Sequence, residues 1–160
     1  MWVADKIKSW SECRSQVKSW QSQHEKVVFT NGCFDILHLG HVEYLEKASK
    51  KGQHLIVGIN SDASVQLLKG EGRPIVSQEA RMRLIAALHF VDLVVCFEEE
   101  TPADLISYLL PDILIKGSDY KVRNIVGADT VLQNGGKVET IELVEGFSTS
   151  NIIKKIKQYY

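Results

Sequence analysis

Two histidines stand three positions apart in the segment TNGCFDILHLGH, which runs from Thr30 to His41. At the opening of a helix, residues three apart project from the same side. His38 and His41 would therefore lie together beside the exposed N–H groups of the helix N-terminus, which favour anions. Gly40 leaves the space between the imidazoles free, and Gly32 lets the backbone turn closely against a ligand. This spacing predicts a compact site for phosphate oxygens.

A metal site is the main alternative for the histidine pair. Two histidines at this spacing can be metal ligands, but the helical HExxH arrangement is absent and no CxxC pair completes a ligand set. The three cysteines, Cys13, Cys33 and Cys96, are widely separated. No GxxxxGK[ST] loop is present, and Gly70-Glu71-Gly72 lacks the third glycine of a dinucleotide-binding loop. We therefore expect no dedicated protein ligands for a metal.

A second anion site is predicted near the C-terminus. Gly146 and Phe147 precede three hydroxyl residues in a row, Ser148, Thr149 and Ser150. Their hydroxyls and backbone N–H groups would stand at the start of the last helix. Two separated phosphate sites in one domain indicate a ligand with more than one phosphate group.

Short apolar runs alternate with helical patterns along most of the chain. This layout predicts a single Rossmann-like α/β domain with about five parallel strands and helices on both faces. Ligands of such sheets bind beyond the carboxyl ends of the strands, where the strand order reverses. The loops of interest are therefore 30–41, 60–76, 116–124 and 144–150. The strands are expected near Val27–Thr30, His54–Ile59, Asp92–Phe97, Ile113–Ile115 and Val138–Leu143.

An amphipathic helix is predicted over residues 4–22, because Ile7, Trp10, Val17 and Trp20 follow an approximately helical spacing. We divide the chain into this N-terminal segment, residues 1–24, and a domain over residues 25–160. The helix is expected to pack on the domain, and a dimer contact through its tryptophans is the alternative. Further along, Thr101-Pro102-Ala103-Asp104 is typical of a capped helix start, with threonine as the cap.

Composition limits the classes of partner. The net charge is −1, with 19 basic and 20 acidic residues, which argues against general nucleic-acid binding. No apolar run approaches membrane-spanning length, and the first residues have no hydrophobic leader region. We expect a cytoplasmic protein that binds a small anion and neither nucleic acid nor membrane.

Two motifs identify a resemblance. The segment TNGCFDILHLGH resembles the GxFDxxHxGH motif of the cytidylyltransferase-like nucleotidyltransferases, and GFSTS resembles their second motif, G-x-S-[ST]-[ST]. Within that superfamily, the stretches VVFTNGCFDILHLGHVEYLEKA, GINSDASVQLLKGEGRPI, VDLVVCFEEETPADLI, PDILIKGSDY and GFSTSNIIKKI resemble the D-glycero-D-manno-heptose 1-phosphate adenylyltransferases. The likeness runs from about Val27 to Ile156. Because this length leaves no room for the kinase half of the bifunctional form, the chain resembles the stand-alone form.

The resemblance implies a reaction of ATP with heptose 1-phosphate that gives ADP-heptose and pyrophosphate, for lipopolysaccharide or surface-glycan heptose supply. The sugar phosphate would attack the α-phosphorus in line, with Mg²⁺ carried mostly by phosphate and water. A homodimer is also implied. The residues expected to act on the phosphates are His38, His41, Lys69, Ser148 and Thr149. Those expected to bind the nucleotide are Asn31, Gly32, Cys33, Phe34, Gly40, Lys116, Gly117, Asp119, Gly146, Phe147 and Ser150.

Three further residues are candidates for the acceptor or a phosphate group, namely Asp35, Arg73 and Arg81. A structural ion pair is the alternative for each arginine, and for Asp35 the alternatives are to assist Mg²⁺ or to brace the turn.

Other functions stay open from the sequence. Another HxGH transferase would use glycerol 3-phosphate, a phosphoalkylamine or a flavin, with CTP or ATP, as in FAD synthetase-like enzymes. A nucleotide sensor without catalysis is a different class of protein. The complete set of phosphate-site residues argues against it, because a sensor need not retain all of them. A fragment of a class I aminoacyl-tRNA synthetase is disfavoured, because the chain has no KMSKS-like loop and no basic surplus.

Overall fold

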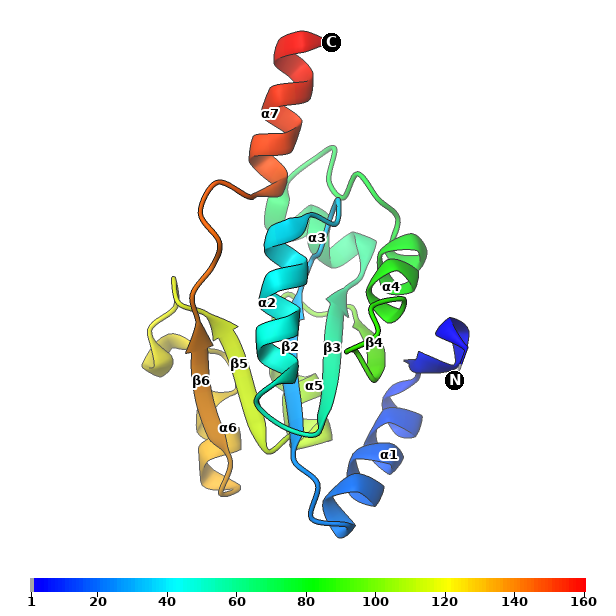
Figure 1. Cartoon of the computed structure of the whole chain (residues 1–160), viewed down its shortest axis with the longest axis vertical. Helices are drawn as coiled ribbons and strands as arrows, with labels where there is room; N and C mark the ends of the chain where they lie inside the picture. The colour runs from blue at the N-terminus through cyan, green and yellow to red at the C-terminus, as the bar shows by residue number, and fades with distance from the viewer. Residues whose placement is uncertain (1) are drawn as a thin grey trace.

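A computed structural model describes residues 2–160, so Met1 of the predicted 1–24 segment lies outside the described residues. Six strands form one parallel sheet in the order β1-β4-β3-β2-β5-β6 within this range (Figure 1). The Rossmann-like α/β prediction is confirmed, with one more strand than expected. The strands are β1 (Ile7–Lys8), β2 (Val27–Gly32), β3 (His54–Asn60), β4 (Leu93–Phe97), β5 (Ile113–Gly117) and β6 (Lys137–Ile141).

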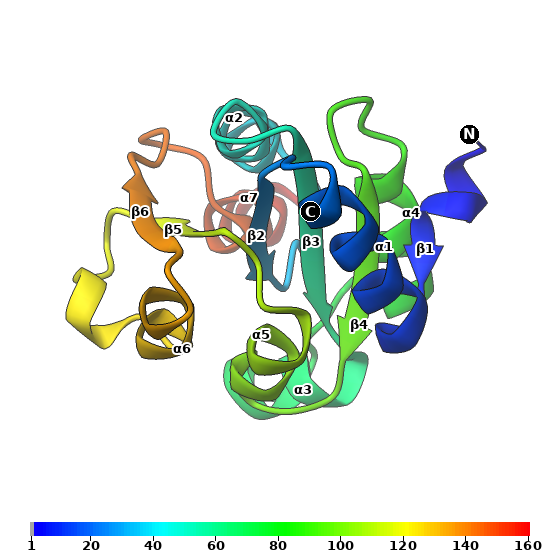
Figure 2. The ribbon, with the colours of Figure 1, turned by 90° about the horizontal axis from the view of Figure 1, so that it is seen from below.

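Helices cover both faces of the sheet (Figure 2). Side chains alternate between the faces along each strand, so Val28 packs with α2 and α4, whereas Phe29 packs with α1, α5 and α6. The α-helices are α1 (Trp10–Ser22), α2 (Leu39–Ser49), α3 (Asp62–Lys69), α4 (Gln78–Ala86), α5 (Ala103–Leu109), α6 (Ala128–Gln133) and α7 (Thr149–Tyr159). Two 3-10 helices, η1 (Val3–Lys6) and η2 (Val122–Asn124), complete the elements.

The N-terminal helix begins later than its apolar spacing predicts. Ser9 caps α1 and forms a reciprocal pair with Glu12, so the helix starts at Trp10. Ile7 instead belongs to β1 and pairs with β4 at the sheet edge. The tryptophans pack within the chain: the Trp10 Nε1 donates to the Cys96 carbonyl at 2.7 Å, and Trp20 stacks on His54 with ring centroids 3.8 Å apart. Packing of the helix on the domain is therefore confirmed for both tryptophans.

Two other helix boundaries differ from the sequence prediction. The 60–76 segment contains a helix, α3, which Ser61 caps by accepting a hydrogen bond from the Ser64 N–H. Lys69 is thus the last residue of a helix and not part of an open loop. The predicted Thr101 cap of α5 is wrong, because the helix starts at Ala103 and Pro102 occupies the cap position without a side-chain hydrogen bond.

The strand order reverses between β2 and β5. From β2 the chain builds outward through β3 to β4 on one side, and β5 and β6 are added on the other side. Loops that leave β2 and β5 therefore diverge at the carboxyl edge and open a space between them. Within residues 2–160, no helix has both the length and the apolar character needed to cross a lipid bilayer.

Candidate active site

A cavity of about 590 Å³ opens at the carboxyl ends of the strands. Its walls come from the segments that follow β2, β3, β4, β5 and β6. Every residue that the sequence singled out for the site lines this cavity except Gly146 and Arg81. Residues 117 positions apart, Cys33 and Ser150, thus share one cavity, as expected for strand ends of a parallel sheet.

The two histidines lie together as their spacing predicted. His38 precedes α2 and His41 stands in its first turn, and their rings stack with centroids 3.7 Å apart. A Cβ on Gly40 would meet the His38 ring and the Phe147 Cβ at 3.1 Å, which explains the glycine between them.

Burial sets the charge of this pair. It lowers the pKa of His41 to about 4, assisted by the neighbouring His38, and it also lowers the pKa of His38. The Nδ1 atoms of both rings are buried and have no hydrogen-bond partner among the described residues. Near neutral pH the pair is therefore uncharged, and each ring has one N–H to donate.

Asp35 is the most heavily bonded polar residue of the cavity. Its carboxylate accepts hydrogen bonds from the Arg73 Nε at 2.7 Å, the Ile75 N–H at 2.8 Å and the Val76 N–H at 2.9 Å. Burial alone raises the pKa of Asp35, but these hydrogen bonds and the Arg73 charge outweigh it and hold the pKa below its usual value. Asp35 therefore braces the turn, which is one of the alternatives that the sequence left open.

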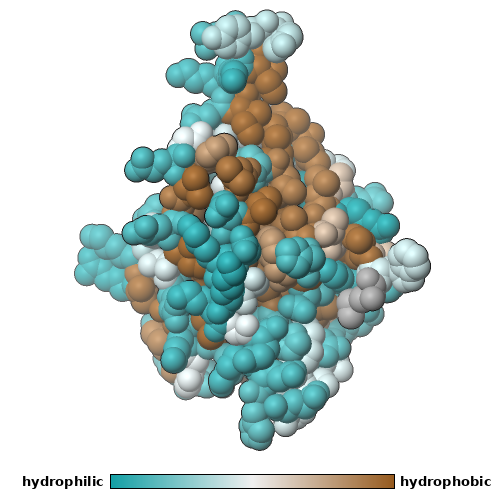
Figure 3. All heavy atoms as spheres, viewed as in Figure 1, coloured by the Kyte–Doolittle hydropathy of each residue, from teal (hydrophilic) through white to brown (hydrophobic). Residues whose placement is uncertain are grey.

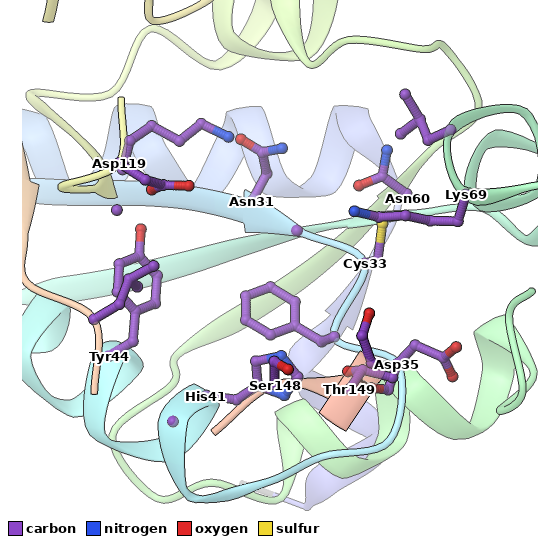
Figure 4. A pocket seen from close by; sticks show the side chains of 18 of the residues that line it. Asn31, Cys33, Asp35, His41, Tyr44, Asn60, Lys69, Asp119, Ser148 and Thr149 are labelled. Carbon is purple, nitrogen blue, oxygen red and sulfur yellow. Dashed lines mark hydrogen bonds between the residues drawn. The ribbon is translucent and has the colours of Figure 1, made fainter. Parts of the chain in front are cut away.

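The C-terminal motif is fastened to the first loop. The Thr149 hydroxyl donates to the Asp35 main-chain carbonyl, although the two residues are 114 positions apart. The Ser148 hydroxyl accepts from the Asn151 N–H at 3.0 Å and caps α7. Figure 4 shows Asp35, His41, Ser148 and Thr149 gathered at one side of the pocket. The two predicted anion sites thus form one site.

The part of the cavity beyond β5 and β6 combines one cation with aromatic and apolar walls. Burial lowers the pKa of Lys116 to about 8, while Asp119 acts in the opposite direction. The Lys116 Nζ lies 5.7 Å from the centre of the Tyr120 ring. A Cβ on Gly117 would meet an Asp119 carboxylate oxygen at 2.6 Å, so a larger residue here would displace the Asp119 side chain. The apolar side chains of this wall are Val126, Leu143, Val144 and Phe147.

The part beyond β3 and β4 is polar and contains two cations. Lys69 reaches into the pocket beside Asn60 and Cys33 from the end of α3 (Figure 4). Arg73 lies on the same side and is held by Asp35. The remaining lining residues of this wall are Leu68, Glu100, Thr101 and Pro102.

Two predicted site residues lie outside the cavity lining. The Arg81 side chain is fully buried, and its guanidinium donates to the Val76 carbonyl, the Cys33 carbonyl and the Asp62 carboxylate. The structural alternative therefore fits Arg81. Gly146 adopts a φ of +84° in the turn before α7, so its role there is conformational.

Several cavity residues were not anticipated. The segment after β4 lies outside the four predicted loops, although the rule of carboxyl strand ends applies to it equally. Tyr44 was missed because its hydroxyl reaches the cavity from within α2, where it is bonded to the Thr30 hydroxyl at 2.8 Å. The full set of unanticipated residues is Tyr44, Asn60, Leu68, Glu100, Thr101, Pro102, Tyr120, Val126, Leu143 and Val144.

Metal-ligating side chains do not cluster in the part of the chain that the structure describes. No group of three or more histidine, cysteine, aspartate or glutamate residues there is placed to hold a metal ion. Asp35 in particular has both carboxylate oxygens occupied by N–H donors.

Comparison with known proteins relates this chain to one family of nucleotidyltransferase-like proteins. Residues 29–155 match the family model described as cytidylyltransferase-like. The bifunctional protein HldE of Magnetococcus marinus is 52% identical over 153 residues, which are 96% of this chain and 31% of that protein. HldE of Campylobacter jejuni subsp. jejuni serotype O:6 is 58% identical over 152 residues, or 95% of this chain and 32% of that protein. The chain thus spans about a third of the length of these curated relatives.

One solved structure supports the same relationship. The crystal structure of the lipopolysaccharide core biosynthesis protein from Thermoplasma volcanium GSS1 matches with a TM-score of 0.60 and 28% identity. The match covers 75% of this chain and 97% of that one.

Proposed function

This chain belongs to the cytidylyltransferase-like family, and we propose that it joins ATP and D-glycero-D-manno-heptose 1-phosphate into ADP-heptose and pyrophosphate. The observation that carries the proposal is the junction of the two motifs in one cavity: the stacked His38 and His41 lie beside the Ser148-Thr149 turn. Three cationic side chains, Lys69, Arg73 and Lys116, line the same cavity. Such a site suits the transfer of a nucleotidyl group between phosphate oxygens.

In the proposed step, an oxygen of the sugar phosphate attacks the α-phosphorus of ATP. The bond from the α-phosphorus to the bridging oxygen breaks, and pyrophosphate leaves with the electron pair. A phosphate monoester is already a competent nucleophile, so the site needs no general base. Positioning and neutralisation of phosphate charge would supply the catalysis.

We assign each phosphate-contacting residue to a phosphate group according to its position in the cavity. His38 and His41 would donate from neutral rings to oxygens of the α- and β-phosphates. Ser148 and Thr149 would hold the β- and γ-phosphates at the N-terminus of α7, whose backbone N–H groups favour anions. Lys69 would approach the phosphates from the opposite wall.

The chemistry of the two cavity walls supports an arrangement of the substrates. Apolar and aromatic side chains near Lys116 and Tyr120 suit a nucleoside, whose base offers a flat apolar face. The wall with Arg73, Asn60 and Glu100 suits a sugar phosphate, because it combines a phosphate-binding cation with groups that hydrogen-bond hydroxyls. The name of the Thermoplasma relative, a lipopolysaccharide core biosynthesis protein, also favours a sugar substrate.

We propose that Mg²⁺ enters with the triphosphate and supplies further charge neutralisation there. Asp35 is committed to N–H donors. Asp119 and Glu100 line the cavity, and their carboxylates form no hydrogen bond or ion pair with other described residues. Because they lie on different sides of the cavity, either one would supply at most a single ligand to the ion, and phosphate and water would supply the others.

We also propose a cytoplasmic homodimer. ATP and a sugar phosphate are substrates of the cytoplasm. Helix α7 extends away from the sheet (Figure 1), and none of its residues is buried within the chain. Its isoleucines, Ile152, Ile153 and Ile156, suit the contact between two copies.

The direct test is turnover of purified protein with Mg²⁺, ATP and the synthetic anomers of heptose 1-phosphate. We expect ADP-heptose by mass spectrometry together with pyrophosphate release. Product formation with CTP and glycerol 3-phosphate, a phosphoalkylamine or a flavin, but not with heptose 1-phosphate, would overturn the substrate assignment.

The role of His41 has its own test. His41→Ala should lower the rate of pyrophosphate release by ~10²–10³, the usual cost of removing a transition-state donor. His89→Ala, at an exposed position outside the cavity, serves as the control and should keep full activity. A loss of less than about tenfold in His41→Ala would contradict the proposed role.

A further inference from the structure

We propose that Asp35 is a positioning residue that aims the Arg73 guanidinium at the phosphate of the acceptor sugar and joins three segments of the cavity wall. This inference rests on the proposed function, because it assigns a task to the acceptor side of that site. Asp35 itself touches neither substrate in this proposal.

The Asp35 carboxylate accepts three hydrogen bonds within the cavity wall. Its side chain is fully buried, and both carboxylate oxygens are used. One oxygen accepts from the Arg73 Nε and the Ile75 N–H, and the other accepts from the Val76 N–H. All three donors belong to the segment 70–76 after α3, so one side chain fixes that segment against the first loop.

The bond to Arg73 orients the guanidinium without using its terminal groups. Only Nε is bonded to Asp35, and the two terminal nitrogens have no hydrogen-bond partner among residues 2–160. Arg73 lines the cavity and its side chain keeps 16% exposure. A guanidinium held in this way presents two parallel N–H groups, which match phosphate oxygens bidentately. The two backbone N–H groups on Asp35 offset part of its negative charge, which favours an anion at Arg73.

The main chain of Asp35 makes the third connection. Its carbonyl accepts the Thr149 hydroxyl at the start of α7. The neighbours Phe34 and Ile36 have φ values of +48° and +53°, a left-handed conformation that costs non-glycine residues energy. The surrounding bonds hold the backbone in this shape. Arg81 adds a second buried connection between the same segments, because it donates to the carbonyls of Cys33 and Val76.

Replacing the Asp35 carboxylate by an amide distinguishes a positioning role, which changes ligand affinity, from a purely structural role, which changes only stability. In Asp35→Asn only one side-chain oxygen accepts, and the new NH₂ group faces N–H donors. We expect the Kd and KM for the sugar phosphate to rise about 10- to 100-fold, the usual range for loss of buried charge-assisted hydrogen bonds. The affinity for ATP should change by less than about threefold, because the nucleoside wall is formed by other segments.

Asp112→Asn is the matched control. The Asp112 carboxylate likewise accepts from a backbone N–H, that of Val27 at 3.0 Å, and from a cation, the Lys26 Nζ at 2.9 Å, but it lies outside the cavity. This variant should lower the Tm and leave both affinities unchanged. A second variant, Arg73→Lys, keeps the positive charge but loses the two parallel N–H groups of the guanidinium. It should raise the Kd for the sugar phosphate while the fold stays intact.

The experiment measures Kd by calorimetry for ATP and for heptose 1-phosphate, together with KM and kcat, in the wild type, the three single variants and the double variant with Asp35→Asn and Arg73→Lys. If Asp35 acts through Arg73, Asp35→Asn combined with Arg73→Lys should weaken sugar phosphate binding hardly more than either change alone. Equal weakening of both ligands in Asp35→Asn would overturn the positioning role, and so would unchanged affinities with only a lower Tm. If Asp35→Asn does not fold, an unchanged sugar phosphate Kd in Arg73→Lys overturns it. Absence of turnover in the wild type overturns the proposed function instead.

Discussion

At the scale of single residues, burial decides what the two cavity histidines can do. A charged imidazolium pair would attract phosphate strongly, but it would also repel itself at a ring separation of 3.7 Å. Burial avoids this by lowering the pKa of both rings. In the proposed reaction, the pair would therefore approach a triphosphate as two neutral donors and contribute directed N–H groups rather than net charge.

The low pKa of His41 has a consequence for stability. Between the ordinary value of 6.5 and about 4, the unfolded chain binds a proton at this residue and the folded chain does not. The stability that neutral His41 contributes is thus complete above pH 6.5 and is lost as the pH falls toward 4. His41→Asn should therefore show a smaller loss of unfolding free energy across this pH range than the wild type, measured by urea denaturation. His89→Asn is the control, and parallel curves for wild type and His41→Asn would contradict the prediction.

The sequence predicted which residues gather at the cavity better than it predicted what each one does. His38 and His41 are neighbours through helical spacing, which is local and visible in the sequence. The partners of Asp35 and Arg81 are backbone groups from distant segments, such as the Val76 N–H and the Cys33 carbonyl. Residue type alone does not distinguish a phosphate-binding arginine from one that is buried among carbonyl groups.

At the scale of elements, strong local sequence patterns were sufficient to predict strands and helices, and weak patterns were not. The central strands have continuous apolar runs, so they were predicted near their actual positions. Strand β1 has two residues and exists only because it pairs with β4, a contact made across 87 positions at Ile7 and Val94. Helix α3 is short and half polar, so its sequence is also typical of a loop.

The start of α6 offers a test of backbone geometry at this scale. Gly127 caps the helix with a φ of +84°, and a Cβ there would lie 2.6 Å from the Ile106 side chain. Gly135 has a similar φ of +80° with nothing within 4 Å, so Gly135→Ala carries only the backbone cost. We expect Gly135→Ala to cost about 1–2 kcal/mol and Gly127→Ala to cost about 1–3 kcal/mol more through overpacking. Urea denaturation measures both, and equal losses would contradict the packing account.

At the scale of the whole molecule, the fold class followed from the alternation of elements, but the strand order did not. Pairing of β2 with both β3 and β5 is a non-local choice, and no short pattern encodes it. Loops at the carboxyl edge were nevertheless identified, because every strand of a parallel sheet ends on that edge whatever the order. Most of the segments that form the cavity walls were therefore predictable from the sequence. Which segments lie on which side of the cavity follows only from the strand order.

The surface of the whole molecule suggests how copies would associate. Figure 3 shows apolar side chains gathered along α7 and on the adjoining upper part of the body. Ile156→Glu, at a side chain 52% exposed on this helix, should shift the protein from dimer to monomer by light scattering coupled to gel filtration. Leu132→Glu, 49% exposed on α6, is the matched control and should leave the dimer intact. A wild type that is monomeric at micromolar concentration, or a dimer unaffected by Ile156→Glu, would contradict the proposed interface.

The bond between Thr149 and the Asp35 carbonyl implies an exchange of partners. A threonine hydroxyl has a single proton to donate, and in the free protein that proton is directed to the first loop. A triphosphate that takes a hydrogen bond from Thr149 must therefore displace the carbonyl. In the proposed function, ligand binding at α7 would then release one restraint on the loop that carries Asp35. Nucleotide binding and the rigidity of the neighbouring wall would depend on the same hydrogen atom.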